Sequence, residues 1–213
     1  MTFFQDFPVP PLPPRPRSQR YVPPPWAAAP AYELPAVVQI GTFLSRTPEM
    51  VVAVKSADVY STGCVFSVSW LIRRGSQSDE DWADLQHLFF QPGRGIRRGT
   101  GRQTGLMFGV QFPDGSKAST GALGPQVFMD REQQPEPPTL SLNNGGGGGG
   151  EDELAGTGTL WLWPLPPAGD LRLVAQWTDF GLAETSIMLD GGKLRAAASG
   201  AQQYWPAEEN NHG

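Results

Sequence analysis

Short runs in which apolar residues alternate with small or polar residues limit this chain to a β-structure. In the clearest run, residues 64–72, every second side chain is apolar and would point to one side of a strand: Cys64, Phe66, Val68, Trp70 and Ile72. Turn signals separate this run from others of strand length, namely 37–44, 51–60, 106–112, 117–120, 159–165, 170–177 and 183–189. Many short strands and few helices predict an all-β fold, an antiparallel β-sandwich of immunoglobulin-like or jelly-roll arrangement.

Two segments have helical rather than strand periodicity. Ser78 and Asp81 form a capping signal at the start of the first segment, residues 79–90. Asp190 can cap the second, residues 191–203, whose apolar residues recur along one stripe. The sequence therefore predicts one or two short helices beside the strands.

The N-terminal segment has a composition that does not fold alone. Eleven of the first 35 residues are proline, which fixes φ and removes the backbone donor, so polyproline II is favoured over helix or sheet. We expect a disordered arm over 1–33, a single domain over 34–206 and a disordered tail at 207–213. A run of six glycines predicts a flexible loop at about 131–155 within the domain.

The arm contains one pattern that points to a partner. Pro10, Pro13 and Arg15 fit a PxxPxR pattern, of the kind that aromatic grooves recognise. Any proline-rich arm that contains arginine can match this pattern. The arm is therefore interpreted either as a solvated extension or as a docking segment.

Charge, cysteine content and hydropathy exclude several classes of protein. The net charge of −5 makes nucleic-acid binding an unexpected role. No segment approaches the roughly 20 apolar residues that span a bilayer, so no membrane partner is expected. The single cysteine, Cys64, allows no internal disulfide or zinc spacing and is interpreted as a small buried residue. A cytoplasmic location is the simplest expectation.

The residues needed for catalysis are scarce. The sequence contains no G-x-S-x-G, HExxH or P-loop motif. Its two histidines are His87, in the first predicted helix, and His212, in the terminal tail. We therefore predict a protein that is not an enzyme and needs no cofactor or metal. A hydrolase built on two carboxylates that folding brings together is the least favoured alternative.

A glycine-punctuated loop supplies the first candidate site. It carries four arginines and no acidic residue: Arg94, Arg97, Arg98 and Arg102. Guanidinium groups bind phosphates and carboxylates through paired hydrogen bonds, so the loop is a candidate for an anionic or carbohydrate ligand. The alternative is a solvated loop whose charges only maintain solubility.

The second candidate site is a predicted tryptophan hairpin. If residues 166–169 form the turn between 159–165 and 170–177, three side chains share one face: Trp161, Trp163 and Arg172. The opposite face is wholly apolar and must be core. The tryptophan face is either an exposed platform for a partner or is covered within the molecule by the arm, the last helix or a long loop, and we expect it to be covered. The leading functional hypothesis is a protein-interaction or structural module that uses this face to bind an unknown protein partner.

Four motifs occur in an order that resembles a group of actinobacterial proteins of unknown function. They are the Leu-Pro-Ala-Val-Val of 34–38, the Gly-Val-Gln-Phe-Pro-Asp-Gly of 109–115, the glycines of 145–150, and the Trp-Pro-Leu-Pro-Pro-Ala-Gly of 163–169. The resemblance covers most of 34–205. It implies a shared globular body and no particular site. It also implies that the glycine run belongs to a family pattern.

Overall fold

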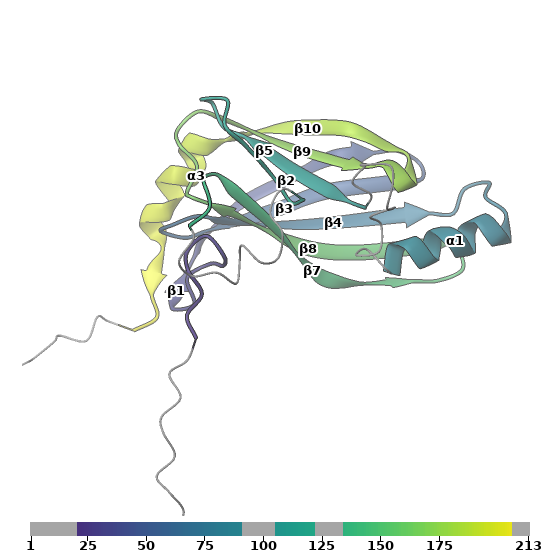
Figure 1. Cartoon of the computed structure of the whole chain (residues 1–213), viewed down its shortest axis with the longest axis horizontal. Coiled ribbons are helices and arrows are strands. Elements are labelled where there is room, and N and C mark those ends of the chain that lie inside the picture. The colour runs from purple at the N-terminus through teal and green to yellow at the C-terminus, as the bar shows by residue number, and fades with distance from the viewer. Residues whose placement is uncertain (1–20, 91–104, 122–133, 206–213) are drawn as a thin grey trace, which may run out of the picture.

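The computed structural model describes residues 21–90, 105–121 and 134–205, which form two larger antiparallel β-sheets and one two-stranded ribbon (Figure 1). The larger sheet has the strand order β2-β3-β4-β8-β7, formed by Ala36–Arg46, Met50–Val59, Cys64–Arg73, Glu153–Trp163 and Thr139–Gly149. The smaller sheet has the order β10-β9-β5-β6, formed by Leu182–Asp190, Asp170–Trp177, Met107–Gln111 and Lys117–Ser119.

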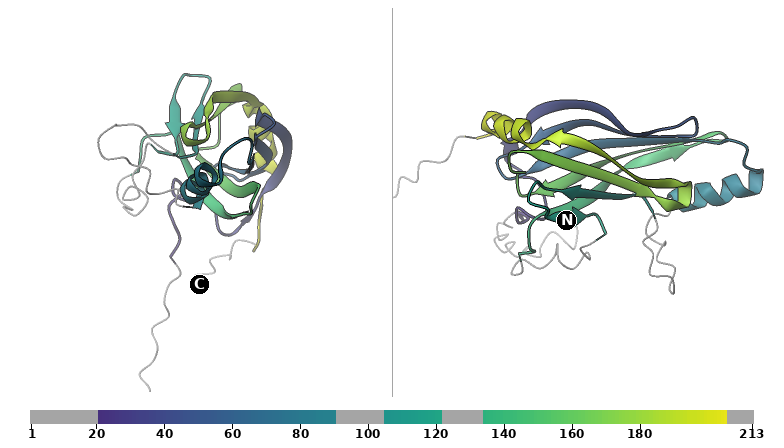
Figure 2. Two further views of the ribbon diagram at one scale, coloured as in Figure 1. Left: turned by 90° about the vertical axis from the view of Figure 1, so that its right-hand side faces the viewer. Right: turned by 90° about the horizontal axis from the view of Figure 1, so that it is seen from above.

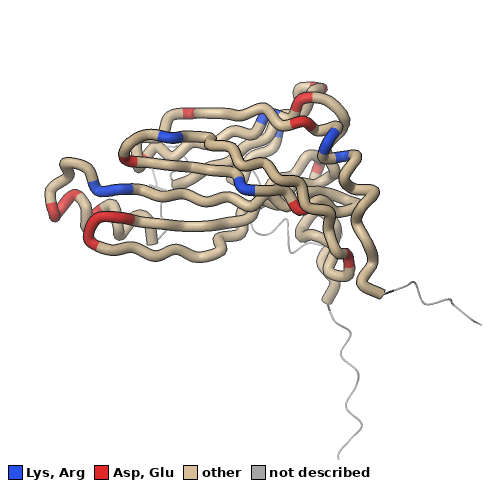
Figure 3. Tube along the Cα trace, turned by 180° about the vertical axis from the view of Figure 1, so that it is seen from behind, with Lys and Arg blue, Asp and Glu red and all other residues tan. Residues whose placement is uncertain are grey.

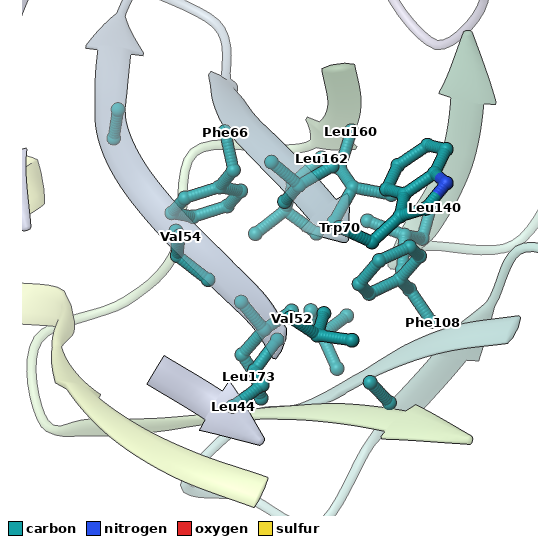
Figure 4. Packing of buried hydrophobic residues seen from close by; sticks show 14 of the residues in the cluster. Leu44, Val52, Val54, Phe66, Trp70, Phe108, Leu140, Leu160, Leu162 and Leu173 are labelled. Atoms are coloured by element: carbon teal, nitrogen blue, oxygen red, sulfur yellow. The ribbon is translucent and has the colours of Figure 1, made fainter. Parts of the chain in front are cut away.

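The two sheets face each other across a single core. Every second residue of β4 is buried, as the alternation predicts. Phe66, Leu160 and Leu162 of the larger sheet lie in one hydrophobic cluster with Phe108 and Leu173 of the smaller sheet (Figure 4). The sheet edges also approach one another, because the Thr185 hydroxyl of β10 donates to the Leu44 carbonyl of β2 at 2.7 Å. The views in Figure 2 show the two layers from the end and from above.

The predicted antiparallel all-β fold with two short helices is confirmed. Helix α1 spans Asp79–Phe90, and its first turn has the predicted cap: the amide of Asp81 donates to Ser78 Oγ at 3.1 Å. Helix α3 spans Gly191–Ala197 and begins with Asp190 Oδ1 accepting from the amide of Lys193 at 2.9 Å. The choice between immunoglobulin-like and jelly-roll arrangements stays a prediction.

The second helix is shorter than predicted. It ends at Ala197 and is followed by a 3-10 turn, η3, over Ala198–Gly200. A short strand, β11 (Gln202–Gln203), then pairs with β1 (Glu33–Leu34). The apolar stripe that predicted a helix as far as residue 203 therefore misassigned its last residues, because their partner strand lies about 170 residues earlier in the chain.

The glycine run is a strand, so the prediction of a flexible loop at 131–155 is wrong for the described part of that range. Strand β7 includes five of the six glycines and pairs with β8 as an edge strand. A side chain at Gly147 would come within 2.9 Å of the Ala155 carbonyl and 3.0 Å of the Phe89 ring. Glycine is used here because helix α1 packs directly on the strand backbone, and Gln86 Nε2 also donates to the Gly150 carbonyl at 2.8 Å.

Candidate interaction surface

The predicted tryptophan hairpin does not form. Strand β8 lies between β4 and β7, whereas β9 lies between β10 and β5 in the other sheet. Trp161 and Trp163 are therefore on the larger sheet and Arg172 is on the smaller one, so the three side chains share no face.

The connection between these strands allows them to lie in different sheets. Pro164 has no amide hydrogen to extend the ladder of β8, and the six residues 164–169 can reach about 20 Å. That length is ample to cross the ~10 Å between packed sheets. The apolar faces of β8 and β9 are both buried as predicted, but they meet across the core instead of side by side. The alternation of residues is the same in either arrangement.

Arg172 is engaged with its neighbour strand β10. Its Nε donates to Ser186 Oγ at 3.0 Å, and its Nη2 donates to Glu184 Oε1 at 3.1 Å. The ion pair is partly exposed, so it contributes only ~0–1 kcal/mol to stability. Arg172 thus pairs within its own sheet instead of joining the two tryptophans.

The two tryptophans are covered by the residues that precede β1. Trp161 is only 2% exposed, and its Nε1 donates to the Pro25 carbonyl at 3.0 Å. The ring of Trp26 meets Trp163 edge to face, with centroids 6.2 Å apart, and Trp163 is half-buried. Coverage within the molecule is therefore confirmed for Trp161. Residues 21–33 correspondingly form part of the folded body and not of a disordered arm.

The remaining candidates are placed as follows. Arg94, Arg97, Arg98, Arg102 and His212 lie outside the described residues, and His87 is exposed on α1. Cys64 is fully buried, and burial raises the pKa of its thiol to about 12, in agreement with its interpretation as a packing residue. Within the described ranges no group of three potential metal ligands is found, and no helix is long and apolar enough to cross a membrane.

The ribbon of β1 and β11 joins the two ends of the described chain. Beyond the paired residues, the amide of Tyr204 donates to the Tyr32 carbonyl at 2.9 Å, so the pairing extends one residue further. Because side chains alternate along a strand, Glu33 and Gln203 share one face of the ribbon. Tyr32, Leu34 and Tyr204 share the other face.

Glu33 anchors the ribbon to the body. Its carboxylate is 6% exposed and accepts from the Ser61 amide at 2.8 Å, the Ser61 hydroxyl at 2.7 Å and Gln203 Nε2 at 3.0 Å. Ser61 lies in the turn between β3 and β4. A buried carboxylate with three hydrogen bonds is well compensated, so it fixes which ribbon face points inward.

The outward face of the ribbon and the residues that follow β11 carry a cluster of exposed aromatic and apolar side chains, here called the terminal aromatic patch: Tyr32, Leu34, Tyr204 and Trp205. The Trp205 ring meets Tyr32 and Tyr204 edge to face, with centroids 5.9 Å and 6.0 Å apart. Trp205 is nonetheless 67% exposed. Contiguous exposed apolar surface of this kind marks interaction sites.

A carboxylate lies on the larger sheet near the ribbon. Asp58 stands on β3 opposite Val37, two residues before Tyr60, and Ser61, the residue after Tyr60, donates to Glu33 of β1. Burial raises the pKa of Tyr60, and the carboxylates of Asp58 and Glu33 raise it further. Asp58 makes no ion pair with any residue that the structure describes. Directly opposite Asp58 in the sheet, Val37 is also exposed. The surface thus combines aromatic rings with a carboxylate that has no ion-pair partner in the part of the chain that the structure describes.

The sequence interpretation missed this patch because its residues come from opposite ends of the folded chain. Tyr204 and Trp205 follow the second predicted helix, and Tyr32 falls within the predicted arm. Comparison of the chain with protein-family models, curated proteins and solved structures found no match.

Proposed function

We propose that the protein is a non-enzymatic interaction module that binds an extended, proline-rich segment of a protein through the terminal aromatic patch. The exposure of Trp205 between two tyrosine rings carries this proposal. Proline-rich segments are pre-extended as polyproline II and bind between aromatic side chains at low entropic cost.

The body already holds a segment of this type. The Val-Pro-Pro-Pro-Trp of 22–26 packs on Trp161 and Trp163, with the Pro25 carbonyl as hydrogen-bond acceptor. Polyproline II leaves its carbonyls unpaired, so an indole N–H such as that of Trp205 is a suitable donor. The same recognition chemistry is therefore available at the exposed patch.

Asp58 supports a preference for a basic residue beside the prolines. Charged residues lie mainly near strand ends and in the connecting turns (Figure 3), so few charges lie along the strands. A guanidinium can pair with the Asp58 carboxylate and stack on a tyrosine ring at the same time. The expected ligand is a cytoplasmic protein segment of prolines flanked by arginine.

Calorimetric titration of the full chain tests the proposal. The probe is a synthetic peptide of ten prolines followed by one arginine. We expect saturable binding that Trp205→Ala abolishes and that Met188→Ala leaves unchanged. Met188 is the matched control, because it is similarly exposed but lies on β10 of the smaller sheet. Absence of saturation, or equal binding by Trp205→Ala, would contradict the proposal.

A second pair of titrations tests the role of the carboxylate. Asp58→Asn should weaken binding of the arginine-containing peptide several-fold while leaving the affinity for a proline-only peptide unchanged. Glu184→Gln, which removes a carboxylate from the smaller sheet, serves as its control.

A further inference from the structure

We propose that the terminal aromatic patch binds the chain's own proline- and arginine-rich segment, residues 8–17, within the same molecule. This inference rests on the proposed function, because it names the segment that the patch binds.

The described chain that follows this segment is connected to the patch. A series of contacts leads from the arm to the patch: Pro25 hydrogen-bonds to Trp161, and the Trp161 ring meets Tyr60 edge to face with centroids 6.0 Å apart. Ser61, which follows Tyr60 in the chain, donates to Glu33 of β1, and β1 pairs with β11, which leads to Tyr204 and Trp205. The first and last described residues lie at the same end of the molecule (Figure 1).

The length of the connecting chain favours docking in the same molecule. Only residues 18–20 separate Arg17 from Tyr21, where the described chain begins. A chain extends by at most ~3.6 Å per residue, so this connection reaches no further than about 14 Å. A tether this short gives an effective concentration in the millimolar range, so even weak docking is populated.

Composition and charge fit the patch. Val9-Pro10-Pro11 repeats the Val-Pro-Pro that begins at Val22, and Pro25, the residue that follows this second copy, accepts a hydrogen bond from Trp161. The first thirty residues carry three arginines, at 15, 17 and 20, against one aspartate. The remainder of the chain is net negative, and its Asp58 carboxylate near the ribbon has no ion-pair partner among the described residues. Arg15 and Arg17 are the cations that would pair with it.

The test uses a spin label on the full-length chain. Leu12→Cys introduces a reactive thiol for the label, while the buried thiol of Cys64 stays unmodified. The readout is paramagnetic broadening of the indole N–H signal of Trp205, assigned by its loss in Trp205→Phe. We expect this signal to lose at least half its intensity relative to the reduced label. The Trp82 indole, buried on α1 at the opposite end of the molecule, should keep its intensity.

A triple variant provides the control. P10S, P13S and R15S together, in the labelled chain, should restore the Trp205 signal. If the Trp205 signal is broadened equally in the presence and absence of these substitutions, the inference is wrong. The same triple variant should bind the synthetic proline–arginine peptide about fivefold more tightly than the natural chain, because a competitor at millimolar effective concentration has been removed.

Two further arms separate the possible occupants. The first arm mixes isotope-labelled chain that lacks the spin label with spin-labelled chain that lacks the isotope. Broadening of the Trp205 signal in this mixture would show that a second copy occupies the patch, and it would overturn docking within one molecule. If the synthetic peptide binds but no broadening occurs in the single chain, the proposed function stands and this inference fails. If neither occurs, both fail.

Discussion

At the α1 end of the molecule Phe89 and Trp177 are buried, whereas at the opposite end Tyr204 and Trp205 are exposed. The buried rings stack with centroids 6.0 Å apart, and Trp177 also meets Trp70 at 6.4 Å. Rings at the exposed end meet at similar separations. Ring contacts alone therefore do not distinguish a core from a surface.

The difference lies in what the backbone provides around the rings. At the α1 end, glycines of β7 and β8 leave room for rings directly above the sheet: a side chain at Gly156 would lie within 2.3 Å of Trp70 Nε1. At the other end Glu33 directs one ribbon face inward, and the aromatic residues occupy the face turned away from the body. The aromatic cluster at the α1 end is buried where neighbouring positions on the strands lack side chains. The cluster at the other end is carried by a ribbon of only two strands and stays exposed.

The largest expected effect is on the buried cluster. Trp177→Ala should lower the free energy of unfolding by ~3–5 kcal/mol, because Trp177 is 5% exposed and its removal leaves a cavity between three aromatic rings. Urea denaturation measures the change. A loss below about 1 kcal/mol would mean that the α1 end is not packed as a core.

A glycine pair on adjacent strands sharpens the comparison. Gly156→Ala should cost ~1–3 kcal/mol, because its Cβ would overlap the Trp70 ring and force it to shift. Gly148→Ala is the matched control: nothing lies within 4 Å of its Cβ, and alanine there reduces the entropy of the unfolded chain. It should be neutral or stabilise by up to about 1 kcal/mol. Equal losses in urea denaturation would refute the idea that ring packing requires these glycines.

Residue pattern predicted the local structure well because side-chain alternation and capping are local properties. The spacing of Phe66, Val68 and Trp70 predicted the inner face of β4, and Ser78 predicted the start of α1. The residue pattern did not predict which strands pair with one another. Leu162 and Leu173 would be buried both in a hairpin and in two facing sheets, so the residue pattern cannot distinguish these arrangements. The prediction that Trp163 and Arg172 share one face was therefore wrong.

The candidate surface needed information of still longer range. The pairing of Tyr32 with Tyr204 depends on a buried carboxylate, Glu33, that bonds both the β3–β4 turn and Gln203. No spacing in the sequence signals such a contact. The glycine run is a second example: its composition favours a loop, but it pairs with β8 as an edge strand, and Phe89 of α1 lies close to Gly147.

The anchor of the exposed end should have an intermediate effect. Glu33→Gln keeps the shape but replaces one acceptor oxygen with a donor, leaving a Ser61 group or Gln203 without its partner. We expect a loss of ~1–2 kcal/mol in thermal or urea unfolding. Glu184→Gln, in an exposed ion pair, should change stability by under about 1 kcal/mol. If both substitutions had the same effect, the ribbon would not depend on Glu33.

Apart from the control substitutions, Trp205→Ala should have the smallest effect on stability. Trp205→Ala should cost about 1 kcal/mol, because the side chain is mostly exposed and loses only its edge contacts with Tyr32 and Tyr204 and any docked segment. The same substitution should abolish binding of the proline–arginine peptide. Substitution of a packing residue lowers both the free energy of unfolding and the affinity for the peptide. Substitution of an interaction residue lowers mainly the affinity. Urea denaturation and calorimetry on the same preparation therefore decide the role of Trp205. A stability loss near that of Trp177→Ala would mean that Trp205 is packed as part of the core. The aromatic clusters at the two ends of the molecule would then have the same structural role.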